Sequence, residues 1–294
     1  MRSFVIALLL LSIVTSAHGL NILVWTSTIG LSHTNFLGGI ADTLKEDGHN
    51  VTLLLVEFDP DFTGETGTKL VEHIIRYSSP YHDPADWYTL TFKKDQVFNV
   101  VLGLNVRDLA RMQVFAYNIC RGILEDSLLL RQLRESRFDL GIFEMMHSCP
   151  AGVMELVGIP KTMLVSAIGM GYHHYRLLGM EKPASFVPGW MCANICEYFE
   201  QSLFDSMLPG FPRLHNLIQD KTDYFLMNTN EFTESTRPTL LSIGHVGGSS
   251  IATPRPLSDE FERIVSKGRE GVILFSLGSL VKSSDMPVAA RRGI

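Results

Sequence analysis

Residues 21–56 read NILVWTSTIGLSHTNFLGGIADTLKEDGHNVTLLLV, and they carry the strongest indication of the fold class. It begins and ends with short apolar runs, at residues 21–26 and 51–56, of the kind that is buried on both faces of a parallel sheet. Between the two runs lies a segment of helical periodicity, at about residues 33–46. The stretch therefore predicts a strand, a helix and a second strand parallel to the first.

The predicted helix is recognisable from one face and from both ends. Its apolar residues Phe36, Ile40 and Leu44 are four apart, which places them on one side of the helix. Ser32 precedes the helix and belongs to a residue type that caps helix N-termini. Gly48 follows the helix and suits the left-handed conformation that commonly ends one.

The same alternation of strands and helices continues to about residue 248. Further strands are predicted at residues 138–143, 161–165, 222–227 and 241–246, and helical segments at 106–135 and 151–157. Alternation at this spacing is typical of an α/β fold with a parallel sheet. We therefore expect one Rossmann-like domain over residues 20–248.

The sequence changes in character after this domain. Glycine, serine and proline are frequent from Gly247 to Pro256, which predicts an interdomain linker over residues 249–270. An apolar run at 271–276 then predicts a strand. We expect a second α/β domain to begin there, with only its first part present in residues 271–294.

Composition and charge exclude one class of partner. Hydrophobic residues make up 46% of the chain and charged residues 19%, which is typical of globular proteins. The net charge is −6, so the chain lacks the basic excess that nucleic-acid binding needs. We expect no nucleic-acid partner.

The N-terminus has the pattern of a secretory signal peptide. Arg2 precedes an apolar run from Phe4 to Val14, which is too short to span a bilayer, and small residues follow at Ala17 and Gly19. We expect residues 1–19 to be cleaved and the chain to enter the lumen of the endoplasmic reticulum. No other apolar run is long enough to anchor the chain in a membrane.

Cysteines and glycosylation sequons are the residues whose chemical state depends on entry into this compartment. The four cysteines are too sparse for a disulfide framework, so we expect buried free thiols at Cys120, Cys149, Cys192 and Cys196. Asn50-Val51-Thr52 is a glycosylation sequon, but it opens a predicted buried strand, which argues against occupancy.

His33 is the first candidate for chemistry. It follows the first strand, and ligands of open α/β sheets bind beyond the carboxyl ends of the strands. The positive end of the helix dipole disfavours an imidazolium, so we expect a neutral imidazole that can act as a general base. The alternative is a histidine that only caps the helix or fills a gap, since the chain has 10 histidines.

Glu144 is the second candidate. It directly follows the predicted strand 138–143, so it lies at the same edge of the sheet as His33. A carboxylate bonded to one imidazole nitrogen fixes the tautomer and stabilises the cation formed when the other nitrogen takes a proton. The alternative is an exposed acid that caps the next helix.

Other motifs are weaker. The sequence has no G-x-S-x-G nucleophile motif and no H-E-x-x-H or C-x-x-C, and we expect neither a metal nor a cofactor. Residues 186–211 are rich in aromatic residues and methionine. Such a stretch is most often core, but it also suits the wall of an apolar pocket or a surface that rests on a membrane.

Several segments together resemble the UDP-glucuronosyltransferase branch of the UDP-glycosyltransferases, in a form typical of nematodes. The matching segments are NILVWTSTIGLSHTNFLGGIADTLKEDGHNVTLL (21–54), FDLGIFEMMHSCPAGVMELVGIPKTMLVSA (138–167), EKPASFVPGW (181–190), DYFLMNTNEF (223–232), HVGG (245–248) and GVILFSLGSLVKSSDMP (271–287). The resemblance implies a GT-B enzyme of two facing Rossmann-like domains. The first domain binds a small lipophilic acceptor and the second binds the UDP-sugar, which is a co-substrate.

The resemblance also implies roles for four residues. His33 matches the catalytic histidine, which deprotonates the acceptor for attack on the anomeric carbon with inversion. Glu144 falls where many members carry an aspartate, so its longer side chain is a departure from the pattern. Gly278 and Ser279 match the first loop of the donor domain, near the nucleotide.

Larger departures concern the second domain. The downstream donor signature is absent from the 294 residues, as are the C-terminal transmembrane helix and basic tail. We therefore expect a C-terminally truncated form that is inactive by itself. An alternative is a non-catalytic module that binds apolar ligands, or forms a homo- or hetero-oligomer with full-length relatives. A third hypothesis, an unrelated α/β lipid carrier, predicts indifference to UDP-sugars.

Overall fold

The computed structural model of the chain describes residues 19–90, 98, 106–144, 146–180, 193–249, 251, 254–278 and 283–293. The strands are β1 (Asn21–Ser27), β2 (Asn50–Val56), β3 (His73–Tyr77), β4 (Leu140–Glu144), β5 (Lys161–Ser166), β6 (Thr222–Met227) and β7 (Ile243–His245). The α-helices are α2 (Leu31–Glu46), α3 (Val106–Glu125), α4 (Ser127–Glu135), α5 (Cys149–Leu156), α6 (Tyr172–Leu177), α7 (Ala193–Met207), α8 (Leu214–Lys221), α9 (Asp259–Val265) and α10 (Val288–Arg291). The short 3₁₀ helices whose bounds lie within the described residues are η1 (Pro60–Phe62), η2 (Pro84–Thr89) and η5 (Ser283–Asp285).

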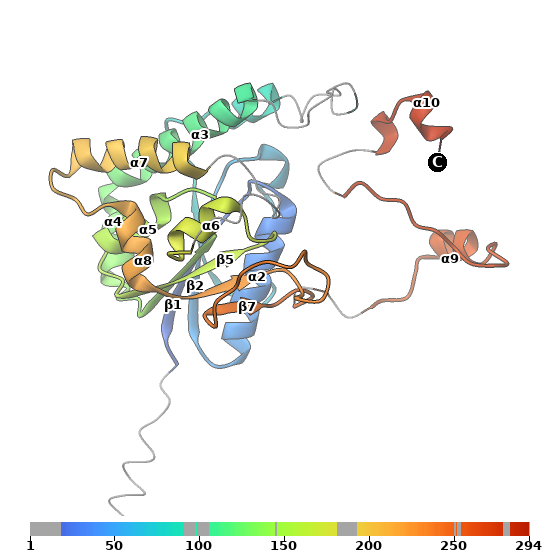
Figure 1. Cartoon of the computed structure of the whole chain (residues 1–294), viewed down its shortest axis with the longest axis horizontal. Helices are drawn as coiled ribbons and strands as arrows, with labels where there is room; N and C mark the ends of the chain where they lie inside the picture. The colour runs from blue at the N-terminus through green and yellow to red at the C-terminus, as the bar shows by residue number, and fades with distance from the viewer. Residues whose placement is uncertain are drawn as a thin grey trace, which may run out of the picture.

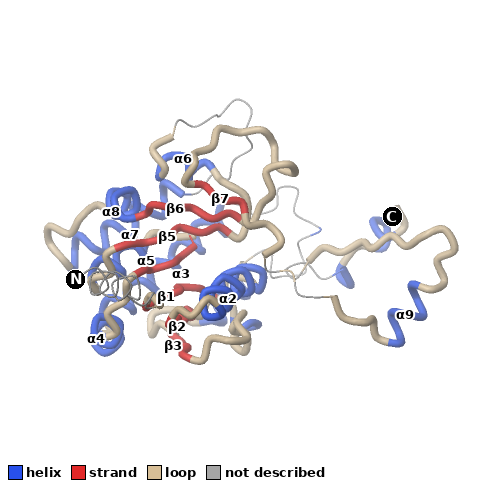
Figure 2. The backbone as a smooth tube through the Cα atoms, turned by 90° about the horizontal axis from the view of Figure 1, so that it is seen from below, coloured by secondary structure: helices blue, strands red, loops and turns tan. Residues whose placement is uncertain are grey.

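The strands form one sheet in the order β3-β2-β1-β4-β5-β6-β7 (Figure 2). Every neighbouring pair is parallel. The chain builds outward from β1 to β3 and then returns to the other side of β1 with β4, so the direction of winding reverses between β1 and β4. This is the doubly wound arrangement of Rossmann-like folds, whose ligand crevice lies at that reversal. The predicted fold class is confirmed.

Each face of the sheet is covered by its own apolar core. On β1, Leu23 and Trp25 pack into the core beneath α3, α4, α5, α7 and α8, whereas Ile22 and Val24 pack against α2. Figure 1 shows α2 on the opposite side of the sheet from α4, α5 and α8. Because both faces are covered, the central strands are apolar at consecutive positions, which is why the runs in the sequence predict them.

Two predicted elements differ in their details. The helical segment 106–135 is two helices, because the side chain of Asp126 accepts hydrogen bonds from the backbone of Leu128 and Leu129 and so caps a new helix, α4. The edge strand β3 was not predicted, since its sequence HIIRY has no alternation and is only partly buried.

The helix α2 begins earlier than predicted. Its N-cap is Gly30 and not Ser32, and no side chain caps the helix there. His33 is consequently the third residue of the first turn. At the other end of the helix, Gly48 has a φ of +89°, in the left-handed region, as predicted.

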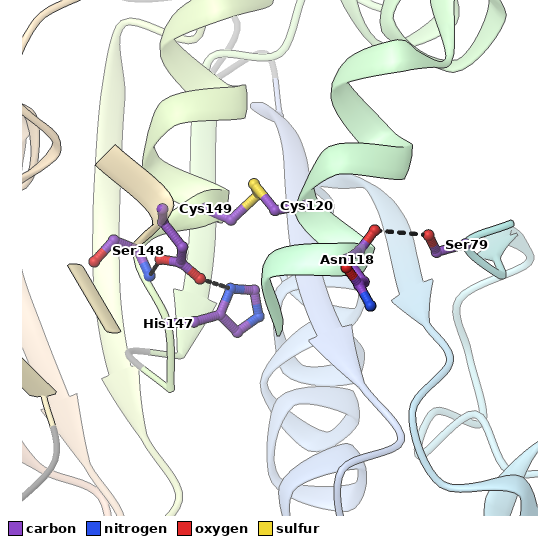
Figure 3. The surroundings of a disulfide bond; sticks show 7 residues. Ser79, Asn118, Cys120, His147, Ser148 and Cys149 are labelled. Carbon is purple, nitrogen blue, oxygen red and sulfur yellow. Dashed lines mark hydrogen bonds and ion pairs between the residues drawn. A yellow bond between two sulfur atoms is a disulfide. The ribbon is translucent and has the colours of Figure 1, made fainter. Parts of the chain in front are cut away.

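A disulfide joins Cys120 in α3 to Cys149 at the start of α5 (Figure 3). The prediction of free thiols is therefore wrong for this pair. The two cysteines are separated by 29 residues, and only the packing of α3 beside the carboxyl end of β4 brings them together. Cys192 lies outside the described residues, and Cys196 lies in α7.

Loss of this disulfide is expected to destabilise the domain. Closing a span of 29 residues removes denatured-state entropy worth about 3–4 kcal/mol, with 2–4 kcal/mol typical of measured bridges. Urea unfolding of the wild type with and without reductant measures the difference. The Cys120→Ala/Cys149→Ala variant should be insensitive to reductant, whereas Cys192→Ala/Cys196→Ala should keep the wild-type response. A wild-type unfolding midpoint unchanged by reductant contradicts this expectation.

The chain after β7 leaves the sheet domain. Figure 1 shows α9 and α10 lying apart from the sheet. The strand predicted at 271–276 does not form: Ile273 and Leu274 are 96% and 88% exposed, and no described strand pairs with them. A strand needs a hydrogen-bonding neighbour, so apolar character alone does not make one. Residues 1–18 of the predicted signal peptide lie outside the described residues. Among the described helices, none combines the length and the apolar character needed to cross a membrane.

Candidate active site

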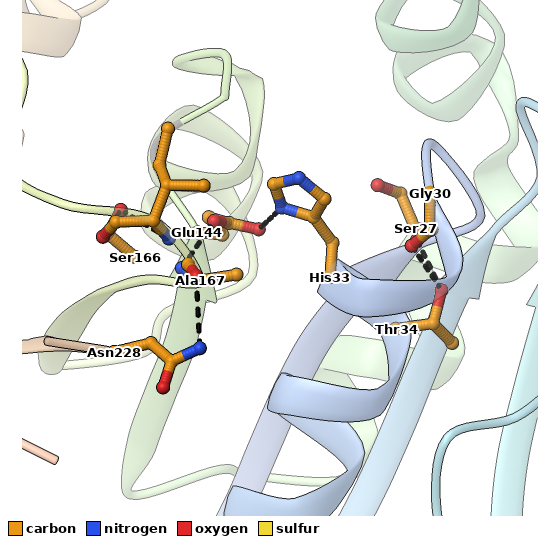
Figure 4. A network of polar contacts seen from close by, with 9 residues as sticks. Ser27, Gly30, His33, Thr34, Glu144, Ser166, Ala167 and Asn228 are labelled. Carbon is orange, nitrogen blue, oxygen red and sulfur yellow. Dashed lines mark hydrogen bonds and ion pairs between the residues drawn. The ribbon is translucent and has the colours of Figure 1, made fainter. Parts of the chain in front are cut away.

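His33 is held at the carboxyl end of β1 by the first turn of α2. Gly30 is extended, with a φ of −175°, and lets the chain turn directly from the strand into the helix. The hydroxyl of Thr34 donates to the carbonyl oxygens of Ser27, at 3.0 Å, and of Gly30, at 3.2 Å (Figure 4). These bonds tie the turn to the end of β1, so the side chain of His33 projects from a fixed point.

Glu144 reaches His33 from the neighbouring strand. It is the last residue of β4, which pairs directly with β1 at the reversal of the sheet. The imidazole Nδ1 of His33 lies 2.7 Å from Oε2 of Glu144, and the two side chains are 16% and 8% exposed. The predicted proximity of the two residues is confirmed, while their catalytic roles stay a prediction.

The second oxygen of Glu144 is also fixed. The backbone N–H of Ala167, just beyond β5, donates to Oε1 at 2.7 Å. The carbonyl of Ala167 in turn accepts from the side-chain amide of Asn228, just beyond β6, at 3.1 Å (Figure 4). One chain of hydrogen bonds therefore connects the carboxyl ends of β1, β4, β5 and β6.

Sequence reasoning missed Ala167 and Asn228. Asn228 directly follows the predicted strand 222–227, so the argument that led to Glu144 applies to it equally well, whereas Ala167 lies two residues beyond the predicted strand 161–165. Ala167 acts through its backbone N–H, and no residue pattern marks such a donor.

The charge of Glu144 changes the proton affinity of His33. Burial by itself lowers the pKa of the imidazole, but the hydrogen bond to Glu144 and its negative charge outweigh burial and raise the pKa above the ordinary value of 6.5. Glu144 thus works against the neutral resting imidazole that the helix N-terminus predicts. When His33 is neutral, its single ring proton lies on Nδ1 and is donated to the carboxylate of Glu144. The lone pair is then on Nε2, which points away from Glu144 in Figure 4.

This arrangement suits the transfer of one proton. Nε2 is able to accept a proton from a hydroxyl placed beyond the sheet edge, and Glu144 stabilises the resulting imidazolium. The N–H of Ala167 keeps the carboxylate in the orientation that this requires.

A second buried pair anchors the loop that follows Glu144. His147 Nδ1 lies 3.3 Å from Oε1 of Glu200 in α7, and the N–H of Ser148 donates to the other oxygen of Glu200 (Figure 3). The two side chains of the pair are almost fully buried. No sequence pattern predicts this contact, because residues 147 and 200 share no motif.

The predicted nucleotide-binding residues are not joined to this site. Gly278 is exposed, with a φ of +76°, and its N–H donates to the Ser276 hydroxyl at 3.4 Å. Within the described part of the chain, no contact links it to His33 or Glu144. Ser279 lies outside the described residues.

Nearly the whole chain is similar to proteins of one known family. The model of the family described as "UDP-glucoronosyl and UDP-glucosyl transferase" matches residues 21–197 and 191–290. The putative UDP-glucuronosyltransferase ugt-47 of Caenorhabditis elegans is 25% identical over 293 residues, which cover 90% of this chain and 54% of that protein. The UDP-glucuronosyltransferase 2B7 of Homo sapiens is 27% identical over 303 residues, covering 89% of this chain and 55% of that protein.

The chain thus spans little more than half the length of these relatives. Among solved structures, the spinosyn forosaminyltransferase SpnP aligns with a TM-score of 0.47 and 12% identity, over 83% of this chain and 54% of that one. The parallel, doubly wound sheet itself establishes the fold.

Proposed function

Because this chain belongs to the UDP-glucoronosyl and UDP-glucosyl transferase family, we propose that it is the acceptor-binding, base-bearing half of a UDP-glycosyltransferase. The hydrogen bond of 2.7 Å between His33 and Glu144, at the reversal point of the sheet, carries this proposal. It is the arrangement that a side-chain general base needs, and it lies where open α/β sheets bind their ligands.

In the proposed reaction, a small lipophilic alcohol, phenol or acid binds beyond the carboxyl edge of the sheet. Its hydroxyl gives a proton to Nε2 of His33 as the oxygen attacks the anomeric carbon of the UDP-sugar. The bond between that carbon and the UDP oxygen breaks, UDP leaves from the opposite face, and the configuration inverts. Glu144 stabilises the imidazolium until the proton is released to solvent.

Binding of the UDP-sugar is proposed to involve other residues. Gly278 and Ser279 are proposed to lie near the nucleotide, with the remaining donor contacts supplied by the part of the relatives that this chain does not span. The UDP-sugar is a co-substrate, and the proposed chemistry calls for neither a metal nor a cofactor. We accordingly propose that the 294 residues do not transfer sugar by themselves.

The secretory pathway is the proposed location. The signal-peptide pattern of residues 1–19 supports it, and so does the buried disulfide between Cys120 and Cys149, since disulfides persist in oxidising compartments.

A second candidate is a non-catalytic module that binds apolar ligands or pairs with full-length relatives. The exposed apolar residues at 272–275 favour it, because a strand-forming segment without a neighbour is a template for pairing with another chain. Sedimentation of this chain alone and with a full-length relative distinguishes a monomer from such a pair.

The pH dependence of sugar transfer tests the proposed base. The assay uses the donor-complete form, in which this chain is joined after residue 290 to the remaining sequence of a full-length relative. Because Glu144 raises the pKa of His33, the acid limb of kcat/KM is expected at a pH above 6.5.

The free energy of unfolding should also depend on pH through the titration of His33. A raised pKa in the folded state stabilises the native protein fully below the unfolded value near 6.5, and this contribution is lost as the pH rises through the folded value. The interaction between His33 and Glu144 therefore contributes least to stability at high pH, where His33 is neutral and able to act as a base. A rate profile whose acid limb lies below pH 6.5 contradicts the assignment of His33 as the base.

A further inference from the structure

Asn50-Val51-Thr52 lies at the edge of the sheet that faces away from the candidate active site. No other N-x-S/T sequon occurs in the 294 residues. Asn50 is the first residue of β2 and pairs in register with Asn21, the first residue of β1. His33 and Glu144 lie at the opposite, carboxyl edge of the same sheet.

The structure removes the objection that this sequon opens a buried strand. Val51 and Thr52 are indeed buried, at 2% and 4% exposure, but Asn50 itself is exposed. The preceding turn, Asp47 and Gly48, is exposed as well. Burial therefore begins one residue after the asparagine, and a large group on its side chain projects into solvent.

The hydrogen bonds of Asn50 are compatible with a modified side chain. Its Nδ2 donates to Oδ1 of Asn21 at 2.8 Å, and a glycosylated amide keeps one N–H that is able to make this bond. Its backbone N–H donates to the carbonyl of Leu20 at 2.9 Å, which fixes the backbone. No bond of the folded sheet has to break to accommodate a sugar.

We propose that Asn50 carries an N-linked glycan. In the lumen, Nδ2 bonds to C1 of a lipid-pyrophosphate-linked oligosaccharide, the bond from C1 to the phosphate oxygen breaks, the lipid pyrophosphate leaves, and the amide loses one proton. Thr52 is buried in the folded chain, and its hydroxyl lies 3.0 Å from His73 Nδ1 of β3. The sequon is therefore modified before β2 pairs with β3. The glycan then covers the amino edge and leaves the carboxyl edge open.

The proposal rests on the lumenal location given under the proposed function. The test expresses the full chain in insect cells and treats it with peptide N-glycosidase in ¹⁸O-water, which converts a glycosylated asparagine into ¹⁸O-labelled aspartate. We expect one mobility shift on treatment and the label at residue 50. The shift should be absent from Asn50→Gln and retained in Thr52→Ser, which keeps both the sequon and the buried hydroxyl.

A second, introduced sequon distinguishes a chain that is not glycosylated at Asn50 from a chain that does not enter the lumen. Phe232→Thr turns residues 230–232 into a sequon at the exposed Asn230, far along the chain from Asn50. A glycan at residue 230 with none at residue 50 overturns the proposal while lumenal entry holds. Glycans at neither position overturn the lumenal location and the proposal together.

Discussion

Replacing His33 by alanine in the donor-complete form is expected to lower kcat for sugar transfer by about 10²–10⁴-fold, the contribution typical of a positioned general base. The alanine leaves no group that is able to take the acceptor proton as the new bond forms. The affinity for the acceptor should change much less, since the imidazole acts on one hydroxyl only. Steady-state kinetics with a phenol acceptor and a UDP-sugar measure both quantities.

The matched control is His49→Ala. His49 lies at the amino edge of the sheet, where Nδ1 accepts from the N–H of Leu20 at 3.0 Å, so its loss should leave kcat unchanged. Urea unfolding of both variants checks that neither has lost its fold. Transfer by His33→Ala at the wild-type rate refutes the role of His33 as base.

Replacing Glu144 by glutamine is expected to reduce kcat on a similar scale, about 10²–10⁴-fold, although the new side chain has nearly the same shape. The N–H of Ala167 needs an acceptor, so the amide oxygen of glutamine takes the place of Oε1. Its NH₂ group then faces His33 and forces Nδ1 to accept. The proton moves to Nε2, and the imidazole loses the lone pair that receives the acceptor proton.

The tautomer is directly observable by ¹⁵N chemical shifts of the histidine ring. Neutral His33 should carry its proton on Nδ1 in the wild type and on Nε2 in Glu144→Gln. Glu144→Asp keeps the charge on a shorter side chain and should fall between the two in rate. Glu155→Gln is the control, because its carboxylate pairs with Lys221 away from the site. An unchanged tautomer with a reduced rate points to a different role for Glu144.

The sequence predicted much of this site because strand ends are easy to locate. The runs at 21–26 and 138–143 are apolar on both faces, so they predict central parallel strands, and the residues that follow them share one edge. His33 and Glu144 meet for that reason alone. Asn228 was open to the same argument.

Other contacts had no local signal. The pairing of Cys120 with Cys149 depends on how α3 packs, and Glu200 reaches His147 from a helix more than fifty residues later. The apolar run at 271–276 shows the converse: its composition favours a strand, but a strand forms only where a neighbour accepts its hydrogen bonds. The local sequence pattern predicts a strand well only where neighbouring strands are present to form hydrogen bonds with it.

We propose that this chain supplies the acceptor side and the base of a sugar transfer. The most direct measurement is transfer from radiolabelled UDP-sugars to a panel of phenols, by the chain alone and by the donor-complete form, each with and without His33→Ala. We expect transfer by the donor-complete form only, and its loss on replacement of His33. Transfer by neither form, or transfer indifferent to His33, contradicts the claim and favours the non-catalytic binding module.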